Sequence, residues 1–220
     1  MEVLVGVLPA LLRGAIVSLT VAFQAGALAV LISICVGVLR NLGSPVINLL
    51  TGVYVEFFRG TSAFVQIYWA YFALPLVGVK LSALEAGIAV LGLNVGAYGS
   101  EVIRGALRAV PAGQREAAHS LGLPTWITFL KILLPQAMMR AVLPMSNLLV
   151  DLLKGTSLLS AITVTELAFA GRQAVSAVGH PLAIFTGVLV LYLIITAPIA
   201  WAGRHLDHWI RMRQQVGRSA

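Results

Sequence analysis

The chain has 220 residues, of which 59% are hydrophobic and only 10% are charged, and its mean hydropathy is +0.94. Because soluble domains carry about a quarter charged residues, this composition excludes an ordinary soluble globule. The formal net charge of +7 does not indicate nucleic-acid binding, because the basic residues are spread between apolar runs. A helix needs about 20 apolar residues to cross a hydrocarbon layer about 30 Å thick, where its backbone must satisfy its own hydrogen bonds. We therefore expect an all-α membrane protein.

Five apolar runs are expected to form transmembrane helices within a single domain over residues 1–220. In chain order they are 15–39, 60–79, 84–104, 132–153 and 181–203. A short segment before the first run is expected to lie at the membrane interface. The semi-polar region 155–180 is expected to hold a short re-entrant or interfacial helix.

The Lys and Arg residues between these runs predict the orientation, because cytoplasmic loops carry an excess of both. Ten fall on one side of a five-span topology: Arg40, Arg59, Arg104, Arg108, Arg115, Lys131, Arg204, Arg211, Arg213 and Arg218. The other side holds Arg13, Lys80 and Arg172, while Arg140 and Lys154 fall within or at the end of a span. We expect the N-terminus outside the cell, and the C-terminal tail and the loop at about 105–131 in the cytoplasm.

The third run carries small residues at every fourth position, namely Gly92, Gly96 and Ser100. Such spacing lets two helix backbones approach closely in lipid. Packing inside the bundle is the favoured interpretation, and a seam against a partner subunit is the alternative.

Three acid–base pairs share the spacing i, i+3, which places both members on one helix face. They are Glu56/Arg59, Glu101/Arg104 and Asp151/Lys154. A central unpaired charge costs about 2.5 to 3.5 kcal/mol on insertion scales, so pairing near the span ends is favourable. Asp151/Lys154 is expected to lie deepest, and for this pair a transport role and a structural role both stay open. The other two pairs are expected to have structural or anchoring roles.

The residue pattern does not indicate catalysis. There is no G-x-x-x-x-G-K-[ST] loop to hold a nucleotide, and no Ser–His–Asp or Cys–His grouping. His119, His180, His205 and His208 are scattered, and two neighbouring histidines fall short of the three or four ligands of a usual metal site. We expect no catalytic residue, no cofactor and no metal.

Residues 116–138, EAAHSLGLPTWITFLKILLPQAM, interrupt the apolar sequence with a short polar helix. Pro111 and Gly113 are expected to end the preceding helix, and GQREAAHSL to form about two turns with a smooth crown at its alanines. Gly122 then ends the short helix by permitting a left-handed backbone. Pro124 suits the first turn of the next helix, where its missing N–H needs no partner. The pattern predicts a rigid knob on the cytoplasmic side.

This loop has the spacing E-A-A, three residues, G, nine residues, I-x-L-P. It resembles the signature loop of the membrane subunits of ATP-binding-cassette importers, and is met by Glu116, Ala117, Ala118, Gly122, Ile132, Leu134 and Pro135. The stretches YVEFFRGTSAFVQ (54–66), GAYGSEVIRGALRAVPAGQ (96–114) and LLKGTSLLS (152–160) resemble the polar amino-acid branch of that family.

The resemblance implies a type I permease subunit of a bacterial inner membrane. Such a subunit pairs with itself or a sister subunit, sits among lipids on two cytoplasmic ATPase subunits, and receives an amino-acid substrate from an external binding protein. The family's coupling role, in which the EAA helix sits in a groove of the ATPase, carries over to Gln114, Arg115, Glu116, Ala117, Ala118, His119, Ser120, Leu121 and Gly122. Candidate residues of the translocation path are Gln66, Asn94, Ser146, Asn147, Asp151, Lys154, Thr156 and Ser157.

Three positions depart from the family pattern. Ser62 replaces the proline of FRGTP, Pro124 replaces a Ser-like cap, and Gly155 replaces the acid often found in KDTS. The Ser62 form, together with YGSEVIRGA, is similar to permeases for the zwitterionic solutes ectoine and hydroxyectoine. The missing acid at Gly155 argues against a strongly cationic amino acid.

Two other classes compete with this interpretation. An ATP-independent secondary transporter or channel needs its own coupling-ion site and usually inverted repeats, which the sequence does not reveal. A membrane scaffold needs no path, and the polar path candidates argue weakly against it.

Overall fold

The structure, a computed structural model, describes residues 2–41 and 43–216, and every regular element in these ranges is a helix. The all-α prediction is therefore confirmed. The elements are α1 (Glu2–Leu39), α2 (Pro45–Gly60), α3 (Ala63–Tyr68), the π-helix η1 (Trp69–Ala73), the 3₁₀-helix η2 (Leu74–Val77), α4 (Ala83–Arg108), α5 (Ala112–Ser120), α6 (Thr125–Ile127), the π-helix η3 (Thr128–Leu133), α7 (Leu134–Gly155), the 3₁₀-helix η4 (Thr156–Ile162), α8 (Leu167–Val178) and α9 (Pro181–Val216).

Four helices in the described ranges are long and apolar enough to cross a membrane: Leu4–Leu39, Ala83–Arg108, Thr125–Ile162 and Pro181–Met212. The run expected at 60–79 forms only the shorter helix Ala63–Val77, which reaches about 22 Å at 1.5 Å per residue. Its hydrogen-bond pattern changes from α to π to 3₁₀ as it approaches Pro75, because proline supplies no N–H to continue the helix. Of the five predicted runs, four form long apolar helices and the second forms this shorter one.

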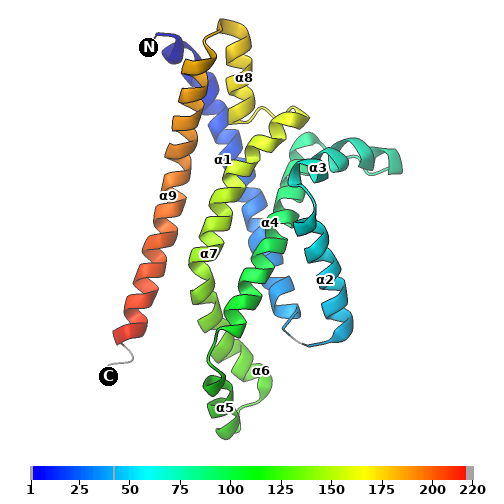
Figure 1. Cartoon of the computed structure of the whole chain (residues 1–220), viewed down its shortest axis with the longest axis vertical. Coiled ribbons are helices and arrows are strands. Elements are labelled where there is room, and N and C mark those ends of the chain that lie inside the picture. The colour runs from blue at the N-terminus through cyan, green and yellow to red at the C-terminus, as the bar shows by residue number, and fades with distance from the viewer. Residues whose placement is uncertain (1, 42, 217–220) are drawn as a thin grey trace.

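The long helices lie side by side, with short elements at both ends of the bundle (Figure 1). The start of α1 and helix α8 lie at one end, which we call the α8 end. Helices α5 and α6 and the last turns of α9 lie at the opposite end, the α5 end (Figure 1). Region 155–180 holds the short helices η4 and α8, which confirms the expected short helix, and its re-entrant or interfacial placement stays a prediction. The segment before residue 15 continues α1 as one helix.

The small residues of α4 pack against α1. A Cβ added to Gly92 would lie 2.7 Å from Leu28, and one added to Gly96 would lie 2.8 Å from Ile32. On the next turn, a Cβ at Gly99 would overlap the hydroxyl of Ser33. The stripe therefore serves packing inside the bundle, which confirms the favoured interpretation.

Three groups of buried side chains hold the helices together. The largest, which includes Val21, Ile67 and Leu159, lies between α1, α3, α4 and η4. A second, around Ile103 and Leu133, joins α4 to η3 and α7. The third joins α1 to α8 and α9 through Leu11, Leu167 and Val188. Because lipid is as apolar as these side chains, van der Waals packing makes the clusters the main connection between helices that the chain links only at their ends.

Candidate coupling and translocation sites

Helix α5 extends past the end of the long helices (Figure 1). Its carboxyl end closes with two backbone hydrogen bonds, from Gly122 N to His119 O at 2.9 Å and from Leu123 N to Ala118 O at 3.0 Å. This pair is the Schellman arrangement, which needs a left-handed residue at the first position beyond the cap. Gly122 supplies it with φ of +69°, as the sequence predicted.

The flanks of α5 are fastened to neighbouring helices. The guanidinium of Arg140 on α7 donates to the carbonyl oxygen of Ala109, just after α4. Gln136 of α7 lies 3.4 Å from Gln114 of α5, between the amide nitrogen and the amide oxygen. The knob is therefore connected to both long helices that flank it, α4 and α7.

Two details of this loop differ from the prediction. Pro124 caps α6 from outside, with ψ of 147°, and the helix begins one residue later at Thr125. The following turn is π-helical over Thr128–Leu133. Pro135 explains the wider turn, since it lacks the N–H that an α-helix would donate to the carbonyl of Lys131.

The predicted coupling residues, 114–122, are exposed except for Ala118, which is 2% exposed. Ala118 thus packs against the rest of the chain. Of the two alanines predicted to lie on the outer surface of α5, only Ala117 does so. Leu121, by contrast, is 77% exposed, so a large apolar side chain stands on the outer surface of the knob.

A groove of about 640 Å³ lies beside α5. Its lining combines the polar side chains of Arg115 and His119 with apolar residues of α6 and η3, including Trp126 and Leu130. Trp126 and Leu130 are both exposed. Exposed aromatic and apolar side chains beside basic ones are typical of protein–protein contact surfaces.

A second cavity, of about 260 Å³, lies where α3, α4, α7 and η4 meet. It brings together two predicted path residues, Asn94 and Asp151, and adds Tyr98 and Gly155. Most of the remaining lining is apolar: Ala63, Leu91, Val95, Leu148, Leu152 and Leu158. The cavity is a mainly apolar space with a few polar groups, the usual composition of a small-molecule site.

Asp151 and Lys154 form their predicted pair beside this cavity, with 3.4 Å between Oδ1 and Nζ. Their side chains are 69% and 59% exposed, respectively. The pair is therefore open on one side of this chain and not sealed within the bundle.

Gln66 and Asn94 are buried together. The amide of Asn94 donates to Gln66 Oε1 at 3.0 Å and to Phe58 O at 2.9 Å. Gln66 in turn donates to Thr61 Oγ1 at 2.6 Å. Both side chains thus satisfy polar groups at the break between α2 and α3, where helical bonds are lost, while Asn94 also borders the cavity.

The other predicted path residues do not line the cavity. Ser146 packs against α9, where a Cβ at Gly203 would overlap its side chain. Thr156 is buried and donates to Leu153 O at 2.8 Å, and Ser157 donates to Lys154 O at 2.9 Å. Asn147 is exposed.

Arg59 does not lie at the α5 end, where the charge count placed it. Its guanidinium carbon lies 5.4 Å from the ring centroid of Tyr98. Tyr98 lies ten residues before the end of α4, which is about 15 Å along the helix. In the described part of the chain Glu56 and Arg59 form no ion pair, so that predicted pair was wrong. Conversely, Arg140 belongs to the α5 end through its bond to Ala109; Arg218 lies outside the described residues.

Sequence analysis missed Glu166, which is fully buried. It caps α8 by accepting from Ala168 N at 2.8 Å and Phe169 N at 2.7 Å, and it also accepts from Tyr192 Oη at 2.8 Å. Ser18 Oγ lies 3.5 Å from the same carboxylate. An acid that directly precedes an apolar helix in a semi-polar region was the available signal, since acids favour helix N-termini.

Comparison with known proteins identifies the family and the fold. Residues 29–212 match the family described as "Binding-protein-dependent transport system inner membrane component". The chain belongs to this family. It is a permease subunit of an ATP-binding-cassette importer, located in the inner membrane, and not itself an enzyme.

Named relatives support the assignment over nearly the whole chain. The chain is 34% identical over 201 residues to a probable amino-acid ABC transporter permease protein of Sinorhizobium fredii, covering 89% of this chain and 84% of the relative. It is 32% identical over 207 residues to the glutamine transport system permease protein of Escherichia coli, covering 93% and 94%.

Solved structures share the fold. A crystal structure of an amino acid ABC transporter with histidines matches with a TM-score of 0.88 and 26% identity, covering 93% of this permease and 96% of that chain. The MetNI methionine ABC transporter in an inward-facing conformation matches with a TM-score of 0.78 and 24% identity, over 91% and 96%.

Proposed function

We propose that this permease, a single domain over residues 1–220, carries amino acids or amino-acid-like solutes, and that helix α5 couples it to a cytoplasmic ATPase dimer. The observation that carries the coupling role is the projecting helix α5, of which only Ala118 is buried. A short helix fastened at both flanks and exposed elsewhere suits insertion into a groove of another protein.

The partners follow from the same assignment. A binding protein delivers the solute at the α8 end, and a second permease subunit, identical or related, completes the path. Relatives named for amino-acid and glutamine transport support the substrate class. An ATP-independent transporter is disfavoured, because the family works with binding proteins.

The α5 end faces the cytoplasm in this proposal. The elements at that end carry Arg115 in α5, Lys131 in η3, and Arg204 and Arg211 near the end of α9. At the opposite end, α8 carries Arg172, and Arg13 precedes Gly14, which packs against α8. The excess of Lys and Arg on one side supports the orientation.

The cavity of Asn94, Tyr98 and Asp151 is the proposed path segment of this subunit. The Asp151–Lys154 pair beside it supplies one charge of each sign, which suits a zwitterionic solute. The narrower resemblance to permeases for ectoine and hydroxyectoine stays a prediction within this class.

Affinity purification from native membranes tests the proposal. We expect an ATPase to co-purify in stoichiometric amount, and liposomes that contain both proteins and the binding protein to accumulate amino acids only with ATP. Uphill uptake by the permease without an ATPase would contradict it.

A further inference from the structure

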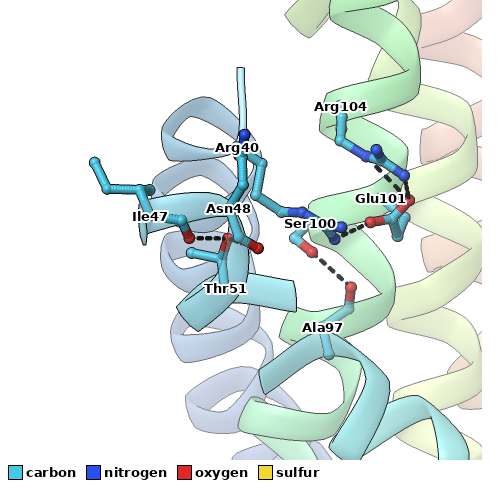
Figure 2. A network of polar contacts seen from close by, with 8 residues as sticks. All are labelled: Arg40, Ile47, Asn48, Thr51, Ala97, Ser100, Glu101 and Arg104. Carbon is cyan, nitrogen blue, oxygen red and sulfur yellow. Dashed lines mark hydrogen bonds and ion pairs between the residues drawn. The ribbon is translucent and has the colours of Figure 1, made fainter. Parts of the chain in front are cut away.

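Three charged side chains meet at the α5 end of the seam between α1 and α4 (Figure 2). Arg40, just after the last residue of α1, pairs with Oε1 of Glu101 on α4. Arg104, one turn further along α4, pairs with Oε2 of the same carboxylate. The first ion pair joins two helices, whereas the second lies within one.

The group is partly shielded from solvent, with Arg40 14% exposed and Glu101 23% exposed. Such a pair is screened less than a surface salt bridge. The group holds two positive charges and one negative charge. Without Glu101 the two guanidinium groups would face each other at the seam and repel, so the carboxylate has a decisive effect on this contact.

The rest of the seam is closely packed. A Cβ at Gly37 would lie 2.7 Å from Ile103 Cβ and 2.9 Å from Ser100 O. Packed small residues allow close approach through van der Waals contacts, but such contacts have little directionality. The Arg40–Glu101 pair adds a charged, directional contact where α1 ends.

The position of Glu101 connects this contact to α5. Two turns of α4 separate Glu101 from Arg108, and α5 begins at Ala112. A displacement of α5 therefore reaches α4 through the chain and α7 through the Arg140–Ala109 bond. Helix α1 is not next to α5 in the sequence, so the chain does not connect the two directly. The Arg40–Glu101 ion pair connects α1 to α4, and α4 leads to α5.

We propose that Glu101 is a positioning residue that locks the end of α1 to α4, so that both helices move together when α5 is displaced. This inference rests on the proposed coupling role of α5. Glu101 touches no solute in this account; it acts by keeping Arg40 and Arg104 in place.

The test uses the complete transporter in liposomes, with its ATPase and binding protein, and measures amino acid transported per ATP hydrolysed. We expect Glu101→Gln and Arg40→Gln each to lower this ratio by about 5- to 10-fold, the lower part of the usual range of coupling between sites. The double variant is expected to lose no more than either single variant, because each single variant already removes the Arg40–Glu101 ion pair.

Two controls separate transmission from general stability. Arg104→Gln removes the pair within α4 and keeps the pair to α1, so we expect a loss below 2-fold, because a pair within one helix does not join α4 to α1. Asp207→Asn removes the 2.8 Å pair with Arg211 within α9 and is expected to leave the ratio unchanged.

The proposal is overturned if Arg40→Gln leaves the ratio intact, or if Arg104→Gln lowers it as much as Arg40→Gln does. Should Glu101→Gln fail to fold, the comparison of Arg40→Gln with Arg104→Gln decides alone. Failure of the unmutated transporter to couple ATP to uptake would instead contradict the proposed function.

Discussion

At the residue scale, Gly122 shows how one backbone conformation shapes the projecting α5 segment. Its φ of +69° is left-handed, yet a Cβ there would meet nothing within 4 Å. A side chain at this position is therefore opposed by its own backbone and not by its neighbours.

Replacing Gly122 with Val is expected to abolish uptake while the protein stays in the membrane. A β-branched residue in this conformation costs about 1–2 kcal/mol or more, which is enough to open the two bonds that close α5. The matched control is Gly105→Val, at another open position in the described chain, where φ is not positive. ATP-dependent uptake and membrane content are measured together, and normal uptake by the Gly122 variant would count against the coupling role.

Glu166 is the other residue whose chemistry is specific, because donors from α1, α8 and α9 approach one carboxylate. We expect Glu166→Gln to destabilise the protein, since its amide group would point N–H at groups that are donors themselves. Leaving buried donors unpaired costs about 1–3 kcal/mol, or on the order of 5 °C in Tm.

Thermal unfolding in detergent checks this expectation, with Glu56→Gln as the control, since Glu56 is exposed. An unchanged Tm for Glu166→Gln would show that the network does not hold α8 in place.

At the element scale, the close contact of α1 and α4 decides the geometry of the bundle. We expect Gly99→Ala to lower Tm, because its methyl group would overlap the hydroxyl of Ser33 and force the helices apart, at a cost of about 1–3 kcal/mol. Gly105→Ala on the same helix faces open space and should be neutral or stabilising. Equal Tm values for the two variants would be inconsistent with this packing.

The Asp151–Lys154 pair beside the cavity between α3, α4, α7 and η4 is expected to affect transport. Neutralising both members of the open pair, with Asp151→Asn and Lys154→Gln, is expected to change the rate or the preference among amino acids, with little effect on Tm. An exposed pair contributes only about 0–1 kcal/mol to stability. Competition uptake with cationic, anionic and zwitterionic amino acids measures this effect, and unchanged transport of all of them would leave the pair purely structural.

Sequence periodicity predicted some elements well and others poorly, for physical reasons. Helix α4 was expected at 84–104 and runs over Ala83–Arg108, because Ser82 and Glu85 form a capping box at its start and small residues mark its packed face. Gly122 was predicted because few residues other than glycine adopt its backbone. The position of Arg59 was not, because it depends on the bend between α2 and α3. The π-helical turns were not predicted either. They depend on Pro75 and Pro135, which follow them in the chain, and hydropathy does not report how a proline changes the hydrogen bonds of the preceding turn.

The residues of the proposed path segment were predicted only in part. Polar residues in apolar helices are either path residues or partners for buried backbone groups, and residue type does not distinguish the two. Gln66 and Asn94 satisfy the helix break at Phe58 and Thr61. Asp151 needs no such role, and it alone of the charged candidates lines the cavity.

At the scale of the whole molecule, burial differs strongly between the long helices. In the most apolar 18-residue stretch of each helix, the buried share is 67% for α4 and 17% for α9. Helix α4 is thus the central element, and it leads directly into α5. This arrangement suits a molecule in which force enters at one end and reaches the whole bundle through its most enclosed helix.

The central claim is that α5 presents its exposed side to an ATPase in the cytoplasm. The most direct test is labelling of a cysteine at Ala117, in a chain with Cys35→Ser, by a maleimide that does not cross membranes; Val178→Cys on α8 is the reference for the opposite side. The account predicts that Ala117→Cys is unlabelled in intact cells, is labelled in inverted vesicles, and is protected when the ATPase is bound. Labelling of Ala117→Cys from outside intact cells, or labelling in inverted vesicles that the bound ATPase does not reduce, would contradict it.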